Sequence, residues 1–257
     1  MPTERERHIV AAFVSLSGDL ADGFDVVDLL TELTTDGARL LDITSAGLLL
    51  ADGLGSLHLL AASSEATRVL ELFQVERSEG PCVDCFNSGA AVSVADLAKE
   101  AERWPRFVPN ALAAGFVSVH AVPMRLRNSV LGALNLFGST VGSLSADDLD
   151  LAQALAHVAA VALVQDKAAA DKDLIVSQLT TALTSRIVIE QAKGVLAQTG
   201  ALDMEQAFAA LRRYARDHNL RLSAVAAAVV NRQLPSQQVV DHASRKAKAG
   251  TESSNTL

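Results

Sequence analysis

Cysteines are scarce in this chain of 257 residues, which holds only two of them. Two cysteines cannot build a disulfide framework, and this indicates a reducing compartment. Long apolar runs are missing as well, since the longest, residues 158–164, is far too short to cross a bilayer. The charged N-terminus, MPTERERHIV, lacks the apolar segment of a secretory signal. These absences predict a soluble, cytoplasmic protein that does not enter a membrane.

Signatures of catalysis are also missing. The sequence shows no nucleophile paired with a base, no phosphate-binding glycine loop and no paired carboxylates, and Gly53-Leu-Gly55 is typical of a turn. We therefore predict no catalytic residue, no metal and no enzyme activity. What the chain does have is apolar content: 49% of its residues are hydrophobic and 20% are charged, which favours a folded core.

Charge is distributed unevenly along the chain. Residues 172–257 hold 11 basic and 7 acidic side chains, a net charge of +4, whereas residues 1–171 hold 11 basic and 23 acidic ones, a net charge of −12. A basic end on an acidic body suggests a surface that meets a polyanion. A mildly basic solvated face would give the same count.

The first part of the chain mixes helical and strand patterns. Apolar residues at helical spacing predict helices within residues 8–44, and the runs 46–51 and 57–62 around Asp52-Gly53 predict a hairpin. The further elements expected are a short helix ending at Gly89, a strand, an interrupted helix and a second hairpin, at residues 78–89, 91–94, 97–114 and 116–137. Hairpins among helices predict an α+β fold with an antiparallel sheet.

A long helix is expected to follow, because Gly and Pro are missing from Ala146 to Ile189. A repeat of seven residues along it indicates a coiled coil between two copies of the chain, formed by Leu149, Ala156, Leu163 and Ala170. We therefore predict a homodimer with a helical connector at residues 166–178.

Three helices are expected after residue 172. The first runs to about Ala197, the second begins at Asp203 with Gln206 as a capping partner, and the third covers residues 223–232. The polar segment 236–257 after Pro235 is expected to be disordered.

Charged side chains on these helices fall on common faces. Arg186, Glu190 and Lys193 share one face of the first helix, and Gly194 keeps the surface beside Lys193 low enough for a bulky ligand to approach. On the second helix Arg212 and Arg216 share an exposed face, with Tyr214 beside it. Arginine binds phosphate and tyrosine stacks on bases, so the pattern suits RNA. Ion pairs of Arg186 and Lys193 with Glu190 are the alternative interpretation.

The stretch LTTALTSRIVIEQAKGVLAQTGALDMEQAFAALRRYARDHNLRLSAVAAAVV resembles the ANTAR domain, the RNA-binding output module of bacterial antitermination regulators. The resemblance is specific in the EQAKG segment and in the downstream spacing of Ala207-Phe208 and Leu211-Arg212. It implies an RNA-binding domain at residues 174–235 that stabilises an antiterminator fold in nascent transcripts with paired stem-loops, usually as a dimer. The resemblance implies that Arg186 and Lys193 contact RNA. Gln191 and Gly194 beside them are further candidates for RNA binding, and the exposed face of the second helix adds Arg212, Tyr214 and Arg216.

Residues 25–165 resemble a GAF domain, on the segments SEGPCVDCFNSGAAVSVADLA, RWPRF and GFVSVHAVPMRLRNSVLGALNLFGS. The resemblance implies a central antiparallel sheet with helices on both sides and a sensory role. Members of this superfamily bind cyclic nucleotides, tetrapyrroles, haem or nothing, so the cofactor is unknown and a small-molecule signal is one possibility. The pattern of a receiver domain is missing, which argues against control by phosphorylation of an aspartate.

The pair Cys82-Val-Asp-Cys85 allows three interpretations. A redox pair needs a thiolate at a helix N-terminus, a metal site needs two further ligands, and the simplest alternative is packing of two small residues.

Together the patterns predict an RNA-binding antitermination regulator under the control of a GAF sensor. The alternatives are a DNA-binding regulator that uses the last two helices as a helix-turn-helix and, with support only from the cysteines, a redox or ligand-binding enzyme.

Overall fold

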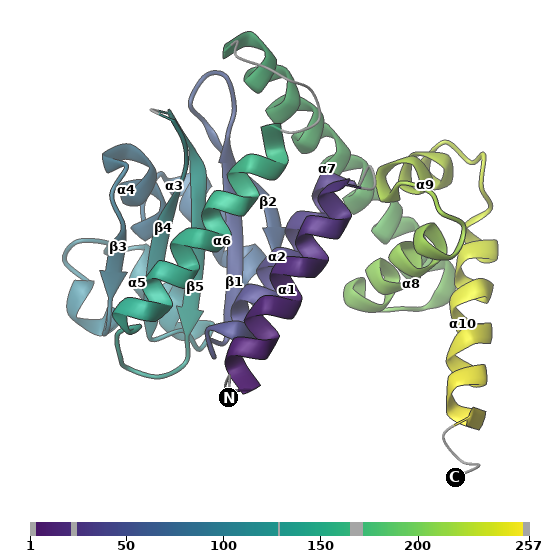
Figure 1. Ribbon diagram of the computed structural model, residues 1–257, viewed down its shortest axis with the longest axis horizontal. Helices are drawn as coiled ribbons and strands as arrows, with labels where there is room; N and C mark the ends of the chain where they lie inside the picture. The colour runs from purple at the N-terminus through teal and green to yellow at the C-terminus, as the bar shows by residue number, and fades with distance from the viewer. Residues whose placement is uncertain (1–3, 22–24, 128, 165–171, 254–257) are drawn as a thin grey trace. The chain divides into compact units, whose positions relative to one another are not determined.

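The computed structural model describes residues 4–21, 25–127, 129–164 and 172–253 (Figure 1). Contacts within the chain define two units, Met1–Ala182 and Leu183–Leu257.

A five-stranded antiparallel sheet forms the centre of the first unit, in the order β2-β1-β5-β4-β3. Both hairpins expected from the sequence are present, because β1 pairs with β2 and β4 pairs with β5. The α+β fold is thereby confirmed. The strands are β1 (Ser45–Ala51), β2 (Leu57–Ala62), β3 (Val92–Val94), β4 (Ser118–Leu126) and β5 (Ser129–Gly138).

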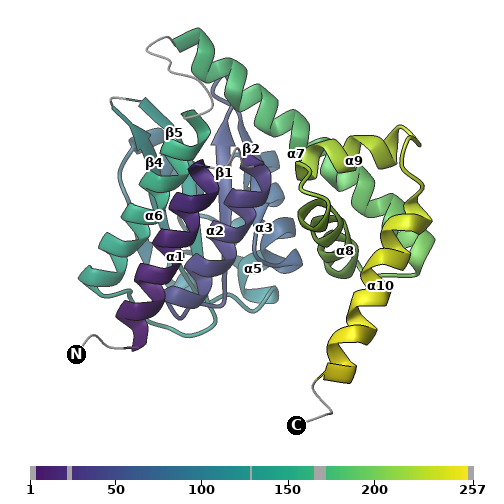
Figure 2. The same ribbon diagram turned by 45° about the vertical axis from the view of Figure 1, so that its right-hand side comes forward.

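Helices cover both faces of this sheet (Figures 1 and 2). On one face α2 (Val26–Leu40) and α6 (Ala146–Val164) pack on the strands, and α1 (Glu4–Ala21) packs on α2. On the other face lie α3 (Glu65–Arg77), α4 (Pro81–Ser88) and α5 (Phe107–Ala113), with the short 3-10 helix η1 (Leu97–Glu100) packed on α5. Because both faces are covered, every residue of β1 is buried.

The helix α3 has no counterpart among the sequence-based predictions. Its buried side chains are Thr67, Leu70, Glu71 and Gln74, so the inward face is largely polar and gives no apolar periodicity. The helix begins at Ser64, whose hydroxyl accepts a hydrogen bond from the backbone N–H of Thr67.

The predicted long helix is described as α6 and α7 (Lys172–Gly200), and the residues between them, Ala170 of the repeat included, lie outside the described part. Ala156 and Leu163 are buried, on a helix that packs on β4 and β5. These positions are therefore core positions of the first unit. The coiled-coil interpretation is wrong for them, because the sheet already fills the space that a second helix would need.

The second unit contains the end of α7, α8 (Met204–Asp217), α9 (Leu222–Val230) and α10 (Ser236–Ser253). The expected capping box at the start of α8 is present: the Asp203 carboxylate accepts from the backbone N–H of Gln206, and the Gln206 side chain accepts from the backbone N–H of Asp203. The three predicted helices are thus confirmed. The prediction of disorder after Pro235 is wrong for α10, because Val239 and Val240 are buried and anchor this otherwise polar helix.

Candidate nucleic-acid interface

Arg186 and Lys193 are brought together by the carboxylate that lies between them on α7. Arg186 Nη2 lies 2.7 Å from Glu190 Oε1, and Lys193 Nζ lies 3.0 Å from Glu190 Oε2. Only 12% of the Arg186 side chain and 11% of the Lys193 side chain is exposed. The ion pairs that the spacing allowed are therefore present, and both cations are largely covered in this conformation.

Lys193 also joins α7 to α8. Its ammonium group lies 5.5 Å from the centre of the Phe208 ring, within the range of a cation–π interaction. A lysine held between a carboxylate and an aromatic face contributes to the packing of the two helices. To contact RNA, the side chain has to exchange Glu190 for a phosphate.

Gln191 and Gly194 are exposed on α7. A Cβ atom placed on Gly194 would meet no atom within 4 Å, so the surface beside it is open, as the sequence predicts. Ile187 and Val195 are exposed next to them, 58% and 38% respectively. This face of α7 is thus low and uncharged, and a ligand can approach it closely.

On α8 the three candidate residues differ in exposure. Arg216 is exposed, Arg212 is half-buried, and Tyr214 is only 6% exposed. The Tyr214 ring stacks on His218 at 4.0 Å between ring centres, and its hydroxyl accepts a hydrogen bond from Gln238 Nε2 on α10. The prediction that Tyr214 lies at the surface is wrong for this conformation, because α10 covers it.

Further exposed arginines lie on the same unit. Arg213 and Arg221, which the sequence places next to the candidates, are exposed, and so is Arg232. Arg232 follows the end of α9, where no motif in the sequence marks it as a candidate. The exposed cations of this unit therefore extend beyond the face that the spacing on α8 predicts.

The helix that a helix-turn-helix would place in DNA is unsuited to that role. α9 has the sequence LSAVAAAVV, and Leu222, Val225, Ala226 and Val229 are buried in it. Ser223 is its only polar side chain, so the helix offers almost no group that could read a base edge.

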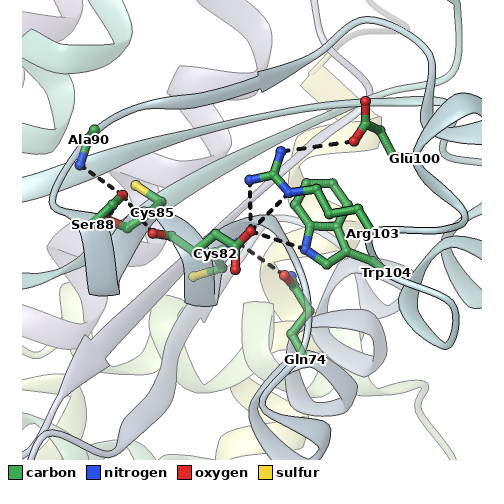
Figure 3. Close-up of polar contacts among 9 residues, drawn as sticks. Gln74, Cys82, Cys85, Ser88, Ala90, Glu100, Arg103 and Trp104 are labelled. Carbon is green, nitrogen blue, oxygen red and sulfur yellow. Dashed lines mark hydrogen bonds and ion pairs between the residues drawn. The ribbon is translucent and has the colours of Figure 1, made fainter.

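The two cysteines lie in the core beside the sheet, on α4 (Figure 3). Both are buried, free thiols. Burial and the nearby Glu71 carboxylate raise the pKa of Cys82 well above its usual value, and burial raises the pKa of Cys85 to about 12. The thiolate that the redox interpretation requires is therefore disfavoured, and the packing interpretation fits the geometry.

Asp84 lies between the two cysteines in the sequence of α4 and is half-buried. Its carboxylate accepts hydrogen bonds from Arg103 Nη2 at 2.8 Å and from Trp104 Nε1 at 3.2 Å. The Arg103 guanidinium also lies over the Trp104 ring, 4.3 Å from its centre. These contacts join α4 to the loop before α5 and give the RWPRF segment a structural role.

A buried carboxylate that sequence reasoning missed lies beside Cys82. Glu71 on α3 accepts hydrogen bonds from Asn135 Nδ2 on β5 at 2.7 Å and from Gln74 Nε2 at 2.9 Å. Burial raises the pKa of Glu71 to about 8, because it removes the hydration of the charged form. Glu71 is buried because it lies on the inward face of α3. Since the sequence does not predict this helix, it gives no signal that Glu71 is buried.

The described residues hold neither a membrane span nor a metal site. No described helix has the length and apolar content needed to cross a bilayer. Within the same residues there is no group of three or more His, Cys, Asp or Glu side chains that could hold a metal ion.

The chain thus joins an α+β domain to a small helical unit with exposed arginines. The GAF domain model matches residues 25–164, and the ANTAR domain model matches residues 177–230. The chain therefore belongs to the GAF family and carries an ANTAR domain at its C-terminal end. GAF is a sensor domain and ANTAR is an RNA-binding antitermination domain, so both domains are regulatory.

Two solved structures are similar to the first unit. The GAF domain from a phosphoenolpyruvate-protein phosphotransferase of Coxiella burnetii is 12% identical with a TM-score of 0.50, and the match covers 63% of this chain and 95% of that one. A free methionine-R-sulfoxide reductase from Neisseria meningitidis, in complex with its substrate, is 16% identical with a TM-score of 0.48, covering 63% and 92%. At 12% identity the likeness to the Coxiella burnetii domain concerns the fold alone. No curated protein matches this chain.

Proposed function

We propose that this protein is a transcription antitermination regulator that binds stem-loops in nascent RNA through its C-terminal helices. The single observation that carries the proposal is the match of residues 177–230 to the ANTAR domain, on a unit whose surface presents exposed arginines. Arginine side chains bind phosphate and stack on unpaired bases, which is how proteins recognise folded RNA. A regulator of nascent transcripts works in the cytoplasm, and we place the protein there.

Each of the two units has its own role. A GAF sensor over residues 25–165 receives a signal, for which a small molecule is one candidate, and the segment 166–178 connects it to the RNA-binding domain at 174–235. A signal that alters the connector changes how two copies of the RNA-binding face are spaced in a homodimer.

The RNA-binding face centres on α7 and α8. Gln191 and Gly194 supply the open surface, Arg212 and Arg216 lie on α8, and Arg186 and Lys193 lie on either side of Glu190. In the free protein Glu190 neutralises both cations. On binding, RNA phosphates take the place of this carboxylate, so Glu190 competes with RNA for the same two side chains.

This competition yields a direct test with a Glu190→Gln variant. Glutamine keeps the size and one hydrogen-bond acceptor but releases the two cations, and each ion pair of this kind is worth about 0.5 kcal/mol. We expect binding of a synthetic RNA with two adjacent stem-loops to become roughly fivefold tighter, a gain of about 1 kcal/mol. Fluorescence anisotropy at fixed salt concentration measures the change.

The matched control is Glu205→Gln, which makes the same change in net charge at an exposed position on α8. Equal gains for both variants would show that Arg186 and Lys193 do not meet the RNA. A second arm uses duplex DNA as competitor. If duplex DNA displaced the stem-loop RNA at equal concentration, the DNA-binding alternative would replace the proposal.

A further inference from the structure

The helix α10 extends the C-terminal unit beyond the segment that matches the ANTAR domain. The match ends at residue 230, whereas α10 runs over Ser236–Ser253 and packs on α8 (Figures 1 and 2). It is thus an addition to the RNA-binding helices and lies directly against one of them.

Polar side chains join α10 to α8. His242 Nε2 lies 2.7 Å from Asp217 Oδ2, Arg213 Nη1 donates to the backbone carbonyl of Ala243 at 3.3 Å, and Gln238 Nε2 donates to the Tyr214 hydroxyl at 3.2 Å. The His242 ring also meets the edge of the Tyr214 ring at 5.3 Å.

Apolar anchoring of α10 rests on two side chains. In the part of the helix whose side chains the structure describes, residues 236–245, Val239 and Val240 are buried and the other eight are half-buried or exposed. These two valines are the apolar part of the contact, and Val240 lies beside Gly200 at the end of α7, so removing both is the change that should release α10.

What α10 covers is the flank of α8 that best suits an unpaired base. Tyr214 is the only tyrosine of the chain, and two of its side-chain partners, Gln238 and His242, come from α10. With α10 displaced, the Tyr214 ring keeps its stacking on His218 but loses Gln238 and His242, so one face of the ring can open to a base, and Arg213 loses its contact with Ala243.

We propose that α10 is a displaceable cover on the RNA-binding unit, which hides Tyr214 and engages Arg213 until RNA takes its place. The proposal rests on the proposed function and adds its regulation. α10 is not an acidic mimic of RNA, because it carries Arg245, Lys246 and Lys248 against Asp241 and Glu252, a net charge of +1. The cover acts by occupying space.

The test detaches α10 in the full-length chain with the double substitution Val239→Ser and Val240→Ser. Binding of the two-stem-loop RNA, measured by anisotropy, is expected to become about tenfold tighter if the covered state holds roughly nine molecules in ten. In this background Tyr214→Leu is expected to weaken binding, whereas Tyr214→Phe, which keeps a stacking ring, is not. Gln237→Ala, on the exposed side of α10, is the matched control and leaves affinity unchanged.

Hydrogen exchange of the unsubstituted protein gives a second readout, which stays decisive if the double variant does not fold. Saturating RNA is expected to speed exchange of the α10 amides at residues 237–245 while it slows exchange in α7 and α8. Unchanged or weaker RNA binding by the double variant, or slower exchange in α10 with RNA, overturns the cover. If neither the unsubstituted chain nor the variant binds the RNA, the proposed function itself fails.

Discussion

The buried carboxylate of Glu71 makes the stability of the sensor domain depend on pH. Glu71 is fully buried, and its pKa rises from an ordinary value of 4.5 to about 8 in the folded protein. Because the folded state holds the proton more tightly than the unfolded state, this group stabilises the fold fully below pH 4.5. The contribution is lost progressively as the pH rises towards 8.

The size of the effect follows from the shift. One pKa unit corresponds to about 1.36 kcal/mol, so at pH 7 the folded protein is less stable than at pH 4.5 by about 3 kcal/mol from this group alone. A Glu71→Gln variant cannot ionise. Asn135 Oδ1 has no hydrogen-bond partner among the described residues, and rotation of this amide lets it accept a hydrogen bond from the introduced glutamine amide.

The assay is urea unfolding followed by the fluorescence of Trp104, which is the only tryptophan and is buried in the sensor domain. The free energy of unfolding is measured from pH 5 to pH 8 for the unsubstituted protein, for Glu71→Gln and for Glu76→Gln, an exposed control on the same helix. The free energy of unfolding of Glu71→Gln is subtracted from that of the unsubstituted protein at each pH. This removes the contributions of other titrating groups that both proteins share, such as the buried His120.

We expect the difference between the unsubstituted protein and Glu71→Gln to grow by about 1 kcal/mol for each pH unit, with the variant more stable at pH 8. The Glu76→Gln control is expected to keep the pH dependence of the unsubstituted protein. A difference that stays constant from pH 5 to pH 8 would refute the reasoning.

Two further predictions concern the cysteines and α7. Cys82 and Cys85 are expected to resist iodoacetamide in the folded protein at pH 8 and to react once urea unfolds it, because burial raises both pKa values; fast alkylation of the folded protein would contradict this. Gly194→Ala is expected to stabilise α7 by about 0.5–1 kcal/mol, since no atom lies near the added methyl group, and yet to weaken RNA binding. Thermal unfolding and anisotropy measure the two effects, and undiminished RNA affinity would show that the ligand does not approach the backbone there.

Local signals in the sequence were enough to predict much of the fold. The Asp52-Gly53 turn, the capping box of Asp203 and Gln206, and the stop at Gly89 each act within a few residues of chain. The helix α3 was not predicted, because polar side chains, Glu71 and Gln74 among them, occupy its inward positions. Helices are recognised in a sequence by apolar residues that recur every three to four positions, and α3 has too few of them on its inward face.

The candidate site could be predicted only in part, because spacing along a helix does not show which contacts a side chain makes. Residue spacing places Arg186 and Lys193 within reach of Glu190, but it cannot say whether ion pairing or RNA binding determines their position. The burial of Tyr214 depends on α10, a segment whose polar composition suggested disorder. Val239 and Val240 anchor this helix, and the average composition of the segment does not reveal two such positions.

The central claim is that the C-terminal helices bind folded transcripts. It is tested most directly by selection: purified full-length protein is mixed with a pool of transcript fragments from its source genome, and the retained RNA is sequenced. Fragments with two adjacent stem-loops that overlap a terminator hairpin are expected to be enriched, and their binding should weaken steeply as salt rises. A retained pool with the same composition as the input, at low salt, would contradict the account.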